Sequence, residues 1–504
     1  MTVFEVLAVT PRTAALLIAP AGARHAQPRP LDWQLEQAGT KQPVQTGRAE
    51  ACTLFLDDLV PATDYRLATR LGEMTFRTSA CAGLVDITDH GAAPDTDCTE
   101  AIAHALDAVP EGGTLHIPPG RYETRPLFLR PNMVLHLAGG AELAAPASRA
   151  DWPQLPARDR SGRPLGSWEG LPENCFAALI TAIDCPRLAI TGRGTLDGGG
   201  DRGDWWSWPK ETRDGARRPR LMHLLYCDDV ILTGVTCRNA PSWTIHPYRC
   251  DRLRAAALTI LNPKDSPNTD GFNPESCTDA RLTGLDFSVG DDCIAIKAGK
   301  RGPAGEDDHL APCTRLSIRH SRMQHGHGAV VIGSEMSGGV ENVRISACDF
   351  VGTDRGLRLK TRRGRGGRIR NIVMEDVAMT GVATPLAINA FYFCDPDGKD
   401  DWVQSRAPRA VDENTPVIEN VALSRVTARD VTCAGVAILG LPEAPVSGIR
   451  LDDVSISVAD APPAPPLMAL HVAAVAGIAM LSEFAEVSGT VDTVARTSSE
   501  ETPC

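Results

Sequence analysis

The chain has 504 residues, of which 43% are hydrophobic, so it can bury a sizeable core and is not a disordered chain. Its formal net charge of -12 argues against a partner nucleic acid or an anionic membrane, because binding to either requires a basic surface. Aromatic residues make up only 5%, whereas Gly (45) and Pro (38) are abundant. This composition favours many short strands joined by turns, and therefore an all-β fold.

The cysteines and the first residues carry expectations about cross-links and compartment. The 15 cysteines show neither CxxC pairs nor zinc-finger spacing, so no disulfide framework and no structural metal are expected. Residues 1–30 lack the features of a signal peptide, which predicts a cytoplasmic protein, or a periplasmic or secreted one if a leader was trimmed. The longest apolar stretch, residues 467–481, is shorter than the ~20 residues of a membrane-spanning helix and is expected to be buried packing.

The first predicted elements are short strands within residues 1–80, for example at residues 14–18 and 53–56. An L-x-P-x-T-x-Y string at residues 59–65 follows them. It resembles the tyrosine corner of fibronectin type III domains, in which the Tyr hydroxyl bonds to the preceding backbone. Residues 1–80 are therefore predicted to form a small fibronectin type III-like β-sandwich, which serves as a rigid spacer or binds carbohydrate.

A helix is predicted next, at the start of a second domain that covers residues 84–504. Asp97 and Glu100 have the spacing of a capping box. The apolar residues that follow share one helical face: Ala101, Ile102, Ala105, Leu106 and Val109. Such a helix, placed before a long run of strands, would suit a cap over the open end of a solenoid.

A repeat dominates the chain beyond residue 180. Each copy opens with a polar pair, followed by an aliphatic residue and then alternating residues. The copies begin near residues 186, 229, 279, 315, 342, 371, 420 and 448. Where no insertion intervenes the period is about 23 to 29 residues, which is typical of stacked coils. The fixed pattern of leucine-rich repeats is missing, so the spacing favours a β-helix whose coils lie ~4.8 Å apart.

Three aspartates recur at almost the same spacing. Asp270 stands in N-T-D-G at residues 268–271, and Asp291 and Asp292 stand in G-D-D-C at residues 290–293, so they should meet on neighbouring coils. In a regular strand Asp291 and Asp292 would point to opposite faces, and Gly290 permits the pleat to break there. Three close carboxylates repel one another, which raises the proton affinity of at least one. A proton donor and one or two bases are what glycosidic hydrolysis requires.

A histidine follows in the next predicted coil, in the G-H-G string at residues 326–328. His327 lies as far from the repeat marker Leu316 as Asp291 lies from the marker Ala280, so the two side chains should stack. The imidazole could then hydrogen-bond the carboxyl group and tune its proton affinity.

A basic strand comes after the histidine. The period of two turns Leu357 and Leu359 inward and places Arg358 and Lys360 together on the outer face. Further arginines surround them, at residues 355, 362, 363, 365, 368 and 370. A basic island in an acidic protein indicates recognition of substrate carboxylates through charge-assisted hydrogen bonds.

Taken together, N-T-D, G-D-D, G-H-G and R-x-K resemble the signature of the polygalacturonases of glycoside hydrolase family 28, over residues 84 to 460. The resemblance implies a right-handed parallel β-helix that hydrolyses the α-1,4-galacturonosyl bonds of a polygalacturonate substrate with inversion, without a metal or cofactor. The residues implied for catalysis are Asp270, Asp291, Asp292 and His327, and those implied for substrate binding are Arg358, Lys360, Asn268 and His246.

The resemblance also implies a division of roles. Asp291 is expected to be the general acid, Asp270 and Asp292 to activate the water, and His327 to support the acid. Asn273 stands where fungal members often carry Asp, which should leave the chemistry intact but alter subsite contacts.

Insertions at residues 158–173, 243–247 and 362–367 look like those of bacterial exo-acting members and would block one end of an open cleft, so exo-action is expected. The alternatives are a rhamnogalacturonan or xylogalacturonan hydrolase on the same scaffold, a polysaccharide lyase, and a non-catalytic carbohydrate-binding β-helix. The sequence pattern carries no signal for the oligomeric state.

Overall fold

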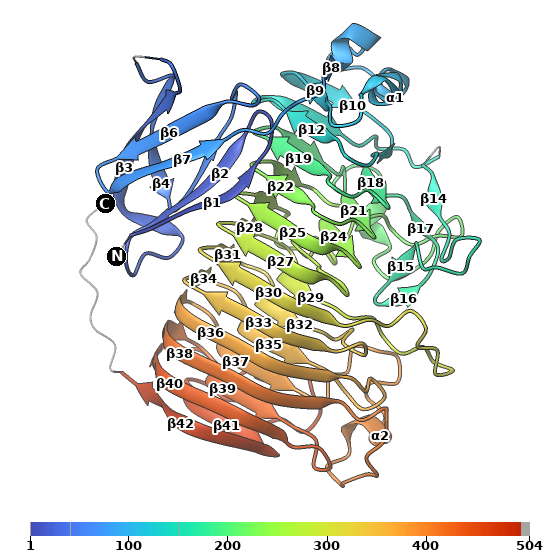
Figure 1. The fold of residues 1–504 in the computed structure, drawn as a ribbon. Helices are drawn as coiled ribbons and strands as arrows, with labels where there is room; N and C mark the ends of the chain where they lie inside the picture. Colours follow the sequence, from blue (N-terminus) through green and yellow to red (C-terminus); the bar gives the residue numbers. More distant parts are fainter. Residues whose placement is uncertain (1, 41, 151, 495–504) are drawn as a thin grey trace.

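The computed structural model describes residues 2–40, 42–150 and 152–494, and nearly all of its regular structure is β (Figure 1). An N-terminal group of antiparallel strands lies beside a long stack of coils. The predicted all-β fold with a parallel β-helix is therefore confirmed. The last ten residues of the predicted 84–504 domain lie outside the described residues.

Two antiparallel sheets make up the N-terminal part. One contains β1 (Val3–Val9), β2 (Ala14–Ala19) and β5 (Thr53–Leu56), and the other contains β4 (Gln45–Ala51), β3 (Ala26–Gln37), β6 (Asp64–Thr69) and β7 (Gly72–Arg77). Their inward side chains form one buried cluster that includes Leu16, Leu35 and Leu67. The hydroxyl of Tyr65 accepts a hydrogen bond from the backbone N–H of Val60 at 2.8 Å, so the tyrosine corner indicated by the L-x-P-x-T-x-Y string is present.

The coils present three parallel faces. The first face contains β8 (Leu84–Asp86), β9 (Thr114–Ile117), β12 (Val134–Leu137), β19 (Ala189–Gly192), β22 (Ile231–Thr233), β25 (Asp251–Ala256), β27 (Thr278–Thr283), β30 (Cys313–Arg319) and β33 (Val340–Ser346). The second contains β10 (Gly120–Glu123), β13 (Ala141–Ala144), β20 (Thr195–Asp197), β23 (Thr236–Arg238), β26 (Thr259–Leu261), β28 (Asp286–Ser288), β31 (Arg322–Gln324) and β34 (Asp349–Val351). The two faces merge in the long strands β36 (Arg368–Thr380), β38 (Val417–Val431), β40 (Val446–Val458) and β42 (Ala485–Thr493).

The third face carries the chemistry described below. It contains β11 (Leu127–Phe128), β18 (Ile180–Ile183), β21 (Met222–Leu225), β24 (Ile245–Tyr248), β29 (Asp292–Ile296), β32 (Gly328–Ile332), β35 (Arg355–Lys360), β37 (Thr384–Asn389), β39 (Ala434–Leu439) and β41 (Ile478–Glu483). Between β24 and β29 a bridge residue, Phe272, pairs with Ile245 on one side and Ile294 on the other. This face is therefore continuous along the stack.

Short elements lie in the insertions and at the ends. They are the strands β14 (Gln154–Leu155), β15 (Ser167–Trp168), β16 (Leu171–Pro172) and β17 (Cys175–Phe176), the 3₁₀ turns η1 (Ile87–His90) and η2 (Trp205–Ser207), and the helices α1 (Thr99–Ala108) and α2 (Asp401–Gln404). In Figure 1 the strands β14 to β17 and the helix α2 project from the same side of the stack. No helix in the described part of the chain is long and apolar enough to cross a membrane.

The helix α1 closes the first end of the coil stack, as its apolar face predicts. Ile102, Ala105 and Leu106 are buried in the same cluster as the coil interior. The predicted capping box is wrong, because the helix is capped at Cys98 without a side-chain bond. The Asp97 carboxylate instead accepts hydrogen bonds from the N–H and hydroxyl of Thr99, so it forms a local turn before the helix.

The repeat predicted from the sequence matches the register in which the strands of neighbouring coils pair. The marker residues pair in order along the first face, from Ala280 to Leu316, Val343, Ile372, Val421 and Ile449. The residue before each marker has a left-handed backbone, with φ of 56° at Asp279 and 59° at Asn342. Asn and Asp tolerate this conformation better than other non-glycine residues, which explains the polar residue that opens most copies.

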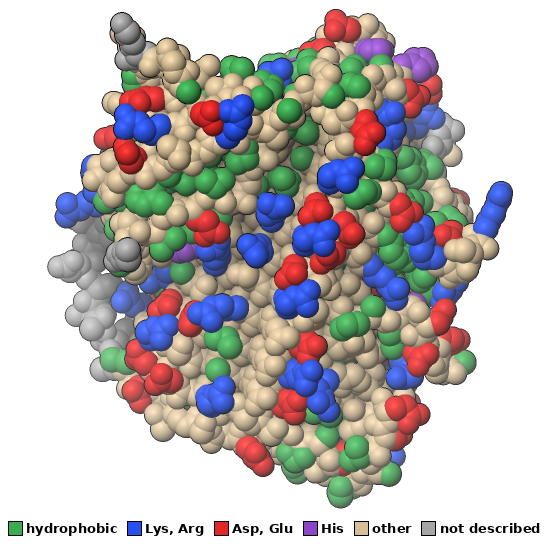
Figure 2. All heavy atoms as spheres, viewed as in Figure 1, with side chains coloured by type: hydrophobic (Ala, Val, Ile, Leu, Met, Phe, Trp, Pro, Cys, Tyr) green, Lys and Arg blue, Asp and Glu red, His purple; other side chains and the backbone are tan. Residues whose placement is uncertain are grey.

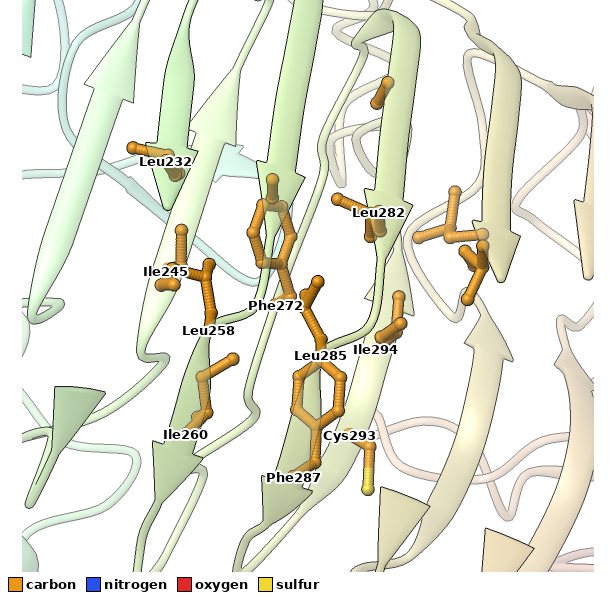
Figure 3. Close-up of a cluster of buried hydrophobic side chains, with 14 of the residues drawn as sticks. Leu232, Ile245, Leu258, Ile260, Phe272, Leu282, Leu285, Phe287, Cys293 and Ile294 are labelled. Atoms are coloured by element: carbon orange, nitrogen blue, oxygen red, sulfur yellow. The ribbon is translucent and has the colours of Figure 1, made fainter. Parts of the chain in front are cut away.

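One continuous apolar core fills the stack. Figure 3 shows part of it, where Ile245, Phe272 and Ile294 from successive coils lie side by side. The same inward positions also hold cysteines, and every cysteine within the described ranges is a free thiol. The core thus supplies a rigid column to which the outer faces are attached.

Opposite charges are interleaved on the exposed face of the coils (Figure 2). Many of these groups pair from one coil to the next, as Arg315 does with Asp279 and Arg322 with Asp286, both at 3.0 Å or less. Each such exposed pair contributes little to stability, but pairing leaves this face without a patch of one sign.

The N-terminal sheets are packed tightly against the coils. The hydroxyls of Thr13 and Thr191 lie 2.8 Å apart in a buried contact, and a buried His136 imidazole lies 2.9 Å from the Asp57 carboxylate. Gly284, in the turn after β27, lies directly under Thr53, because a Cβ there would be 2.1 Å from a Thr53 methyl carbon. We expect this glycine to be required for packing the N-terminal sandwich against the coils.

The close contact between Gly284 and Thr53 gives a prediction for stability. Gly284→Ala should lower the free energy of unfolding by about 1–3 kcal/mol, because the added methyl overlaps Thr53. Gly381→Ala is the matched control, since Gly381 has nearly the same φ (64° against 67°) but no atom within 3.9 Å of the place that an added methyl would take. Denaturant unfolding of both variants checks the prediction, and equal losses would show that backbone strain alone is responsible.

Candidate active site

An open cleft of about 600 Å³ lies on the outer face of the third sheet, where β29, β32 and β35 begin or end. Its lining carries both signs of charge. The acidic members are Glu169, Asp270, Asp291, Asp292, Glu335 and Asp354, and the basic ones are Lys210, Lys297, His327, Arg355, Arg358, Lys360 and Lys399. Seven of the eight residues predicted for the site line this cleft, and the exception is His246.

Two of the acids come from the start of β29. Asp292 is the first residue of the strand, and Asp291 precedes it. Cys293 and Ile294 are both buried in the core, so the alternation breaks here and both aspartates reach the cleft. Gly290 allows this through close approach, because a Cβ there would lie 2.4 Å from the carbonyl oxygen of Ser266. The predicted break in the pleat is present.

The third acid, Asp270, comes from the preceding coil. The N–H of Gly271 donates to the carbonyl of Asp292 at 3.0 Å, which fixes the two coils against each other. The Asn273 amide donates to the Asp270 carboxylate at 2.7 Å, and Asn273 is fully buried. The expectation that Asn273 alters subsite contacts is wrong, because this residue lies behind Asp270 and is shielded from the cleft.

His327 lies next to Asp291, as the spacing predicts. Asp292 pairs with Gly328 in the parallel register of β29 and β32, so the residues before them are also neighbours. The Nδ1 atom of His327 lies 3.0 Å from Asp291 Oδ1. Gly328 leaves the space between the acid and the basic strand open, since a Cβ there would be 3.2 Å from Asp292 Oδ1.

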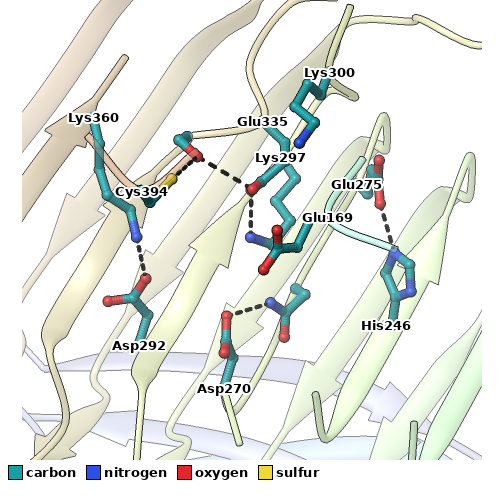
Figure 4. A network of polar contacts seen from close by, with 12 residues as sticks. Glu169, His246, Asp270, Glu275, Asp292, Lys297, Lys300, Glu335, Lys360 and Cys394 are labelled. Carbon is teal, nitrogen blue, oxygen red and sulfur yellow. Dashed lines mark hydrogen bonds and ion pairs between the residues drawn. The ribbon is translucent and has the colours of Figure 1, made fainter. Parts of the chain in front are cut away.

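The basic strand β35 faces the acids, but its two cations are not equivalent. The Lys360 ammonium donates to Asp292 Oδ2 at 2.7 Å and is 7% exposed, so it already has a carboxylate partner (Figure 4). Arg358 lies 3.5 Å from Asp292 Oδ1, with its guanidinium over the Tyr392 ring. Leu357 and Leu359 point into the core, as the period of two predicts.

The electrostatic surroundings shift the pKa values of Asp270 and Asp291 in opposite directions. Burial, together with the charges of Asp291 and Asp292, raises the pKa of Asp270 well above its ordinary value, despite Lys297 and the Asn273 amide. A raised pKa means that Asp270 holds a proton more readily than a free carboxyl group.

The Asp291 and His327 pair shifts the other way. Burial alone would raise the pKa of Asp291, but the hydrogen bond and charge of His327, with Lys360 and Arg358, lower it to about 2. The hydrogen bond to Asp291 raises the pKa of His327 to about 9, against the effect of burial. The two side chains therefore share one proton near neutral pH, and in the free protein it sits on His327.

Among the charged residues of the cleft that sequence reasoning missed, Lys297 and Glu335 form a close pair. The Lys297 ammonium lies 2.7 Å from Glu335 Oε2 and above the Trp243 ring, and both charged side chains are nearly buried (Figure 4). The charge of Glu335 raises the pKa of Lys297 despite burial. The sequence does contain a signal for Lys297. Ile294 and Ile296 point inward, and the period of two then places Lys297 on the outer face.

Asn268 and His246 have different surroundings from those predicted. Asn268 lines the cleft, and its side-chain Oδ1 accepts a hydrogen bond from the buried Arg218 at 2.6 Å, so the side chain is held in place. His246 is fully buried, stacked on His223 and bonded to Glu275 at 2.8 Å. The prediction that His246 binds substrate directly is therefore wrong. His246 lies beneath the wall of the cleft, where its contacts are structural.

Insertions bury the third face on both sides of the acids. On the side of β24, Trp168 from the insertion stacks on Trp243, which contacts His246. The same insertion is tied to the loop after β29, where the Lys300 N–H donates to the Gly170 carbonyl at 3.0 Å. The other end is covered beyond β35.

On that other side, β37 and β39 carry a separate apolar cluster. Ala387, Leu439, Phe391 and Leu467 are buried together in it, although the first two lie on the outer face of the sheet. The open part of the third face thus spans β29, β32 and β35, which are two steps of ~4.8 Å. Within the described ranges, no three or more His, Cys, Asp or Glu side chains are arranged to hold a metal ion.

Comparisons with known proteins agree with this geometry. The family model described as glycosyl hydrolases family 28 matches residues 169–465. A "Probable polygalacturonase" of Vitis vinifera is 32% identical over 354 residues, which cover 69% of this chain and 68% of that protein. A polygalacturonase of Ralstonia solanacearum is 26% identical, with 62% of this chain and 65% of that protein covered. The matches thus span about two thirds of these relatives.

Solved structures give the same result. An exopolygalacturonase from Thermotoga maritima superposes with a TM-score of 0.64 at 25% identity, over 81% of this chain and 91% of that one. A family 28 exopolygalacturonase from Yersinia enterocolitica superposes with a TM-score of 0.70 over 98% of each chain, and at 20% identity this likeness shows the fold.

The shared proton leads to a prediction for titration. The imidazole of His327 should titrate near pH 9 by NMR, and Asp291→Asn should return it toward 6.5, because the hydrogen bond to Asp291 is the largest cause of the shift. Asp354→Asn is the control, since Asp354 is a minor cause and its loss should leave most of the shift. A wild-type value near 6.5 would contradict the pairing.

The same pair has a consequence for stability. The raised pKa means that the contribution of His327 is fully present below pH 6.5 and is lost as the pH rises through about 9. More than half of the His327 side chain is exposed, so solvent keeps this contribution small.

Proposed function

This chain belongs to the glycosyl hydrolases of family 28, and from that membership we propose that it hydrolyses the α-1,4-galacturonosyl linkages of polygalacturonate and its oligomers. The observation that carries the proposal is that three carboxylates and the cations of Arg358 and Lys360 line one cleft, in a protein of net charge -12. An acidic sugar polymer needs a local basic surface in such a protein, and hydrolysis needs carboxyl groups beside it.

Arg358 is proposed as the main group that recognises a sugar carboxylate. Its guanidinium has five donors and suits a carboxylate in a two-pronged contact, and its nearest acidic atom, Asp292 Oδ1, lies 3.5 Å away. Lys360 is closer to Asp292, at 2.7 Å, so it is proposed to hold that acid in place and to add positive charge to the site.

The three acids are proposed to divide the work according to their exposure. Asp291 is the general acid, because its side chain is 21% exposed and can reach the oxygen of the leaving sugar. Asp270 and Asp292 are 4% and 2% exposed and face the same cleft, where they hold and activate the attacking water. This arrangement gives hydrolysis with inversion, with acid and water on opposite sides of the sugar.

The low pKa of Asp291 in the free protein fits this role once substrate is present. Lys360 and Arg358 are two of the groups that lower it. A sugar carboxylate bound at Arg358 would offset their charge, so the pKa of Asp291 should rise on binding. His327, 3.0 Å away, can then pass its proton to Asp291, which gives it to the leaving group.

The assignment of the acid gives a prediction. Asp291→Asn should reduce kcat on galacturonate oligomers by about 10²–10⁴, because general acid catalysis contributes that much, while substrate still binds. On an aryl galacturonide the loss should be much smaller, because the leaving group no longer needs a proton. Asp354→Asn, another acid of the cleft lining, is the control and should stay near wild-type activity. If Asp270→Asn, rather than Asp291→Asn, loses much less activity on the aryl galacturonide than on the oligomers, Asp270 is the acid.

Exo-action is proposed because the third face is exposed only between β29 and β35, and it is covered by other parts of the chain on both sides of this stretch. Trp168 and Trp243 cover it before the acids, and the cluster around Leu439 and Leu467 covers it after Arg358. A long polymer cannot lie across such a site, whereas a chain terminus can enter it. The exopolygalacturonases from Thermotoga maritima and Yersinia enterocolitica share this fold.

Product analysis tests the activity and the mode of attack together. Incubation with polygalacturonate should release a short product of one length from the first minutes, with little fall in viscosity, and NMR of fresh product should show the inverted anomer. A falling ladder of oligomers would contradict exo-action. Unsaturated products would indicate a lyase, and no product from any galacturonate polymer or oligomer would overturn the proposed function.

A further inference from the structure

A proline-rich segment after β40 crosses the outer face of the third sheet. Residues 461–476, called the strap here, leave the coil stack, and an antiparallel bridge between Ala464 and Val475 joins the two arms of the strap. Its buried residue Leu467 packs in the cluster on β37 and β39. The apolar stretch that begins at residue 467 is therefore only partly buried, because Met468 is 39% exposed, and this corrects the expectation of simple buried packing.

Several hydrogen bonds fix the strap beside the basic strand. Arg355 donates to the carbonyl of Pro466 at 2.9 Å, and the amide of Asn389 donates to the carbonyl of Met468 at 3.0 Å. The N–H of Leu470 donates to the side chain of Gln404 at 2.9 Å. These contacts reach the strap from β35, from β37 and from α2, so its backbone is held on three sides.

The side chain of Met468 meets the cation proposed to recognise the substrate. The guanidinium of Arg358 donates to the Met468 sulfur at 3.2 Å and also lies over the Tyr392 ring. A thioether is a weak acceptor, so the contact orients the guanidinium without neutralising it. Met468 also lines the cleft at the edge where the buried part of the sheet begins.

We propose that Met468 is a specificity-determining residue, which closes the cleft beyond Arg358 and limits how many sugar rings of the substrate extend past that residue. The inference rests on the proposed function, because it concerns the length of a galacturonate chain. The strap supplies the position and the Met468 side chain supplies the bulk. An acidic oligomer that is longer on this side would have to displace the Met468 side chain, whose backbone is fixed by hydrogen bonds from Arg355 and Asn389 to the strap.

The test compares galacturonate oligomers of increasing length. Met468→Ala should raise the ratio of kcat/KM for the longest oligomer to kcat/KM for the dimer by about tenfold, the scale at which a pocket discriminates by side-chain size. Met468→Leu keeps the bulk without the sulfur and should leave the ratio near the wild-type value. An unchanged ratio in Met468→Ala would overturn the proposal.

A control separates the side chain from the strap. Val472 is a strap residue that packs against the same apolar cluster and does not line the cleft, so Val472→Ala loosens the strap without changing the lining. It should leave the ratio unchanged, and a change equal to that of Met468→Ala would show that strap mobility sets the chain length. Thermal unfolding of each variant confirms that all are folded.

A binding measurement keeps the two proposals distinguishable. If the wild type hydrolyses no member of the series, the proposed function fails. Affinities of the Asp291→Asn protein for the same oligomers then still test Met468, because affinity should stop rising with length while Met468 is present. In the double variant with Met468→Ala affinity should continue to rise, and identical length dependence in both proteins would contradict the inference.

Discussion

The parallel register between coils is the constraint on which the site depends. Residues 36 positions apart, such as Asp291 and His327, become neighbours because β29 and β32 pair in register. The spacing of ~4.8 Å between strands lets side chains at paired positions reach each other and form a hydrogen bond. A shift of one residue would turn Asp292 toward the core, so the buried ladder beneath the site also protects its chemistry.

A balance of charge in the cleft follows from that register. The acids of β29 and the preceding coil lie within reach of Lys297, Arg358 and Lys360, and each carboxylate has a different set of partners. Such partners make three identical side chains chemically distinct. The same balance explains how an acidic protein can offer a site for an acidic polymer, because the cations are concentrated where the third face is open.

Sequence reasoning found the elements that repeat and missed those that cover them. The markers from Ala280 to Ile449, the stacking of His327 on Asp291 and the outward direction of Arg358 all follow from a period, so the sequence contains them directly. His246 was assigned to substrate binding on the family resemblance, which does not show that Trp243 and the Trp168 insertion cover it in this chain.

The same limit applies to the strap and to Asn273. Covering segments have no period, and their docking depends on contacts such as those of Arg355 and Asn389 with the strap backbone. The motif N-T-D-G-F-N shows that Asn273 is near Asp270, but only the turn of the backbone shows that its amide faces that carboxylate. Lys297 is the one omission that the period of two could have supplied.

The glycine beneath Thr53 has a consequence for how the two parts of the chain can be recombined. Gly234 does the same for Phe55, where a Cβ would lie 2.5 Å from the ring. The sandwich therefore cannot be treated as an exchangeable module. Grafting it onto another β-helix would require glycines in the two corresponding turns of the recipient, and a helix that lost the sandwich would expose a buried interface that includes His136 and Thr191.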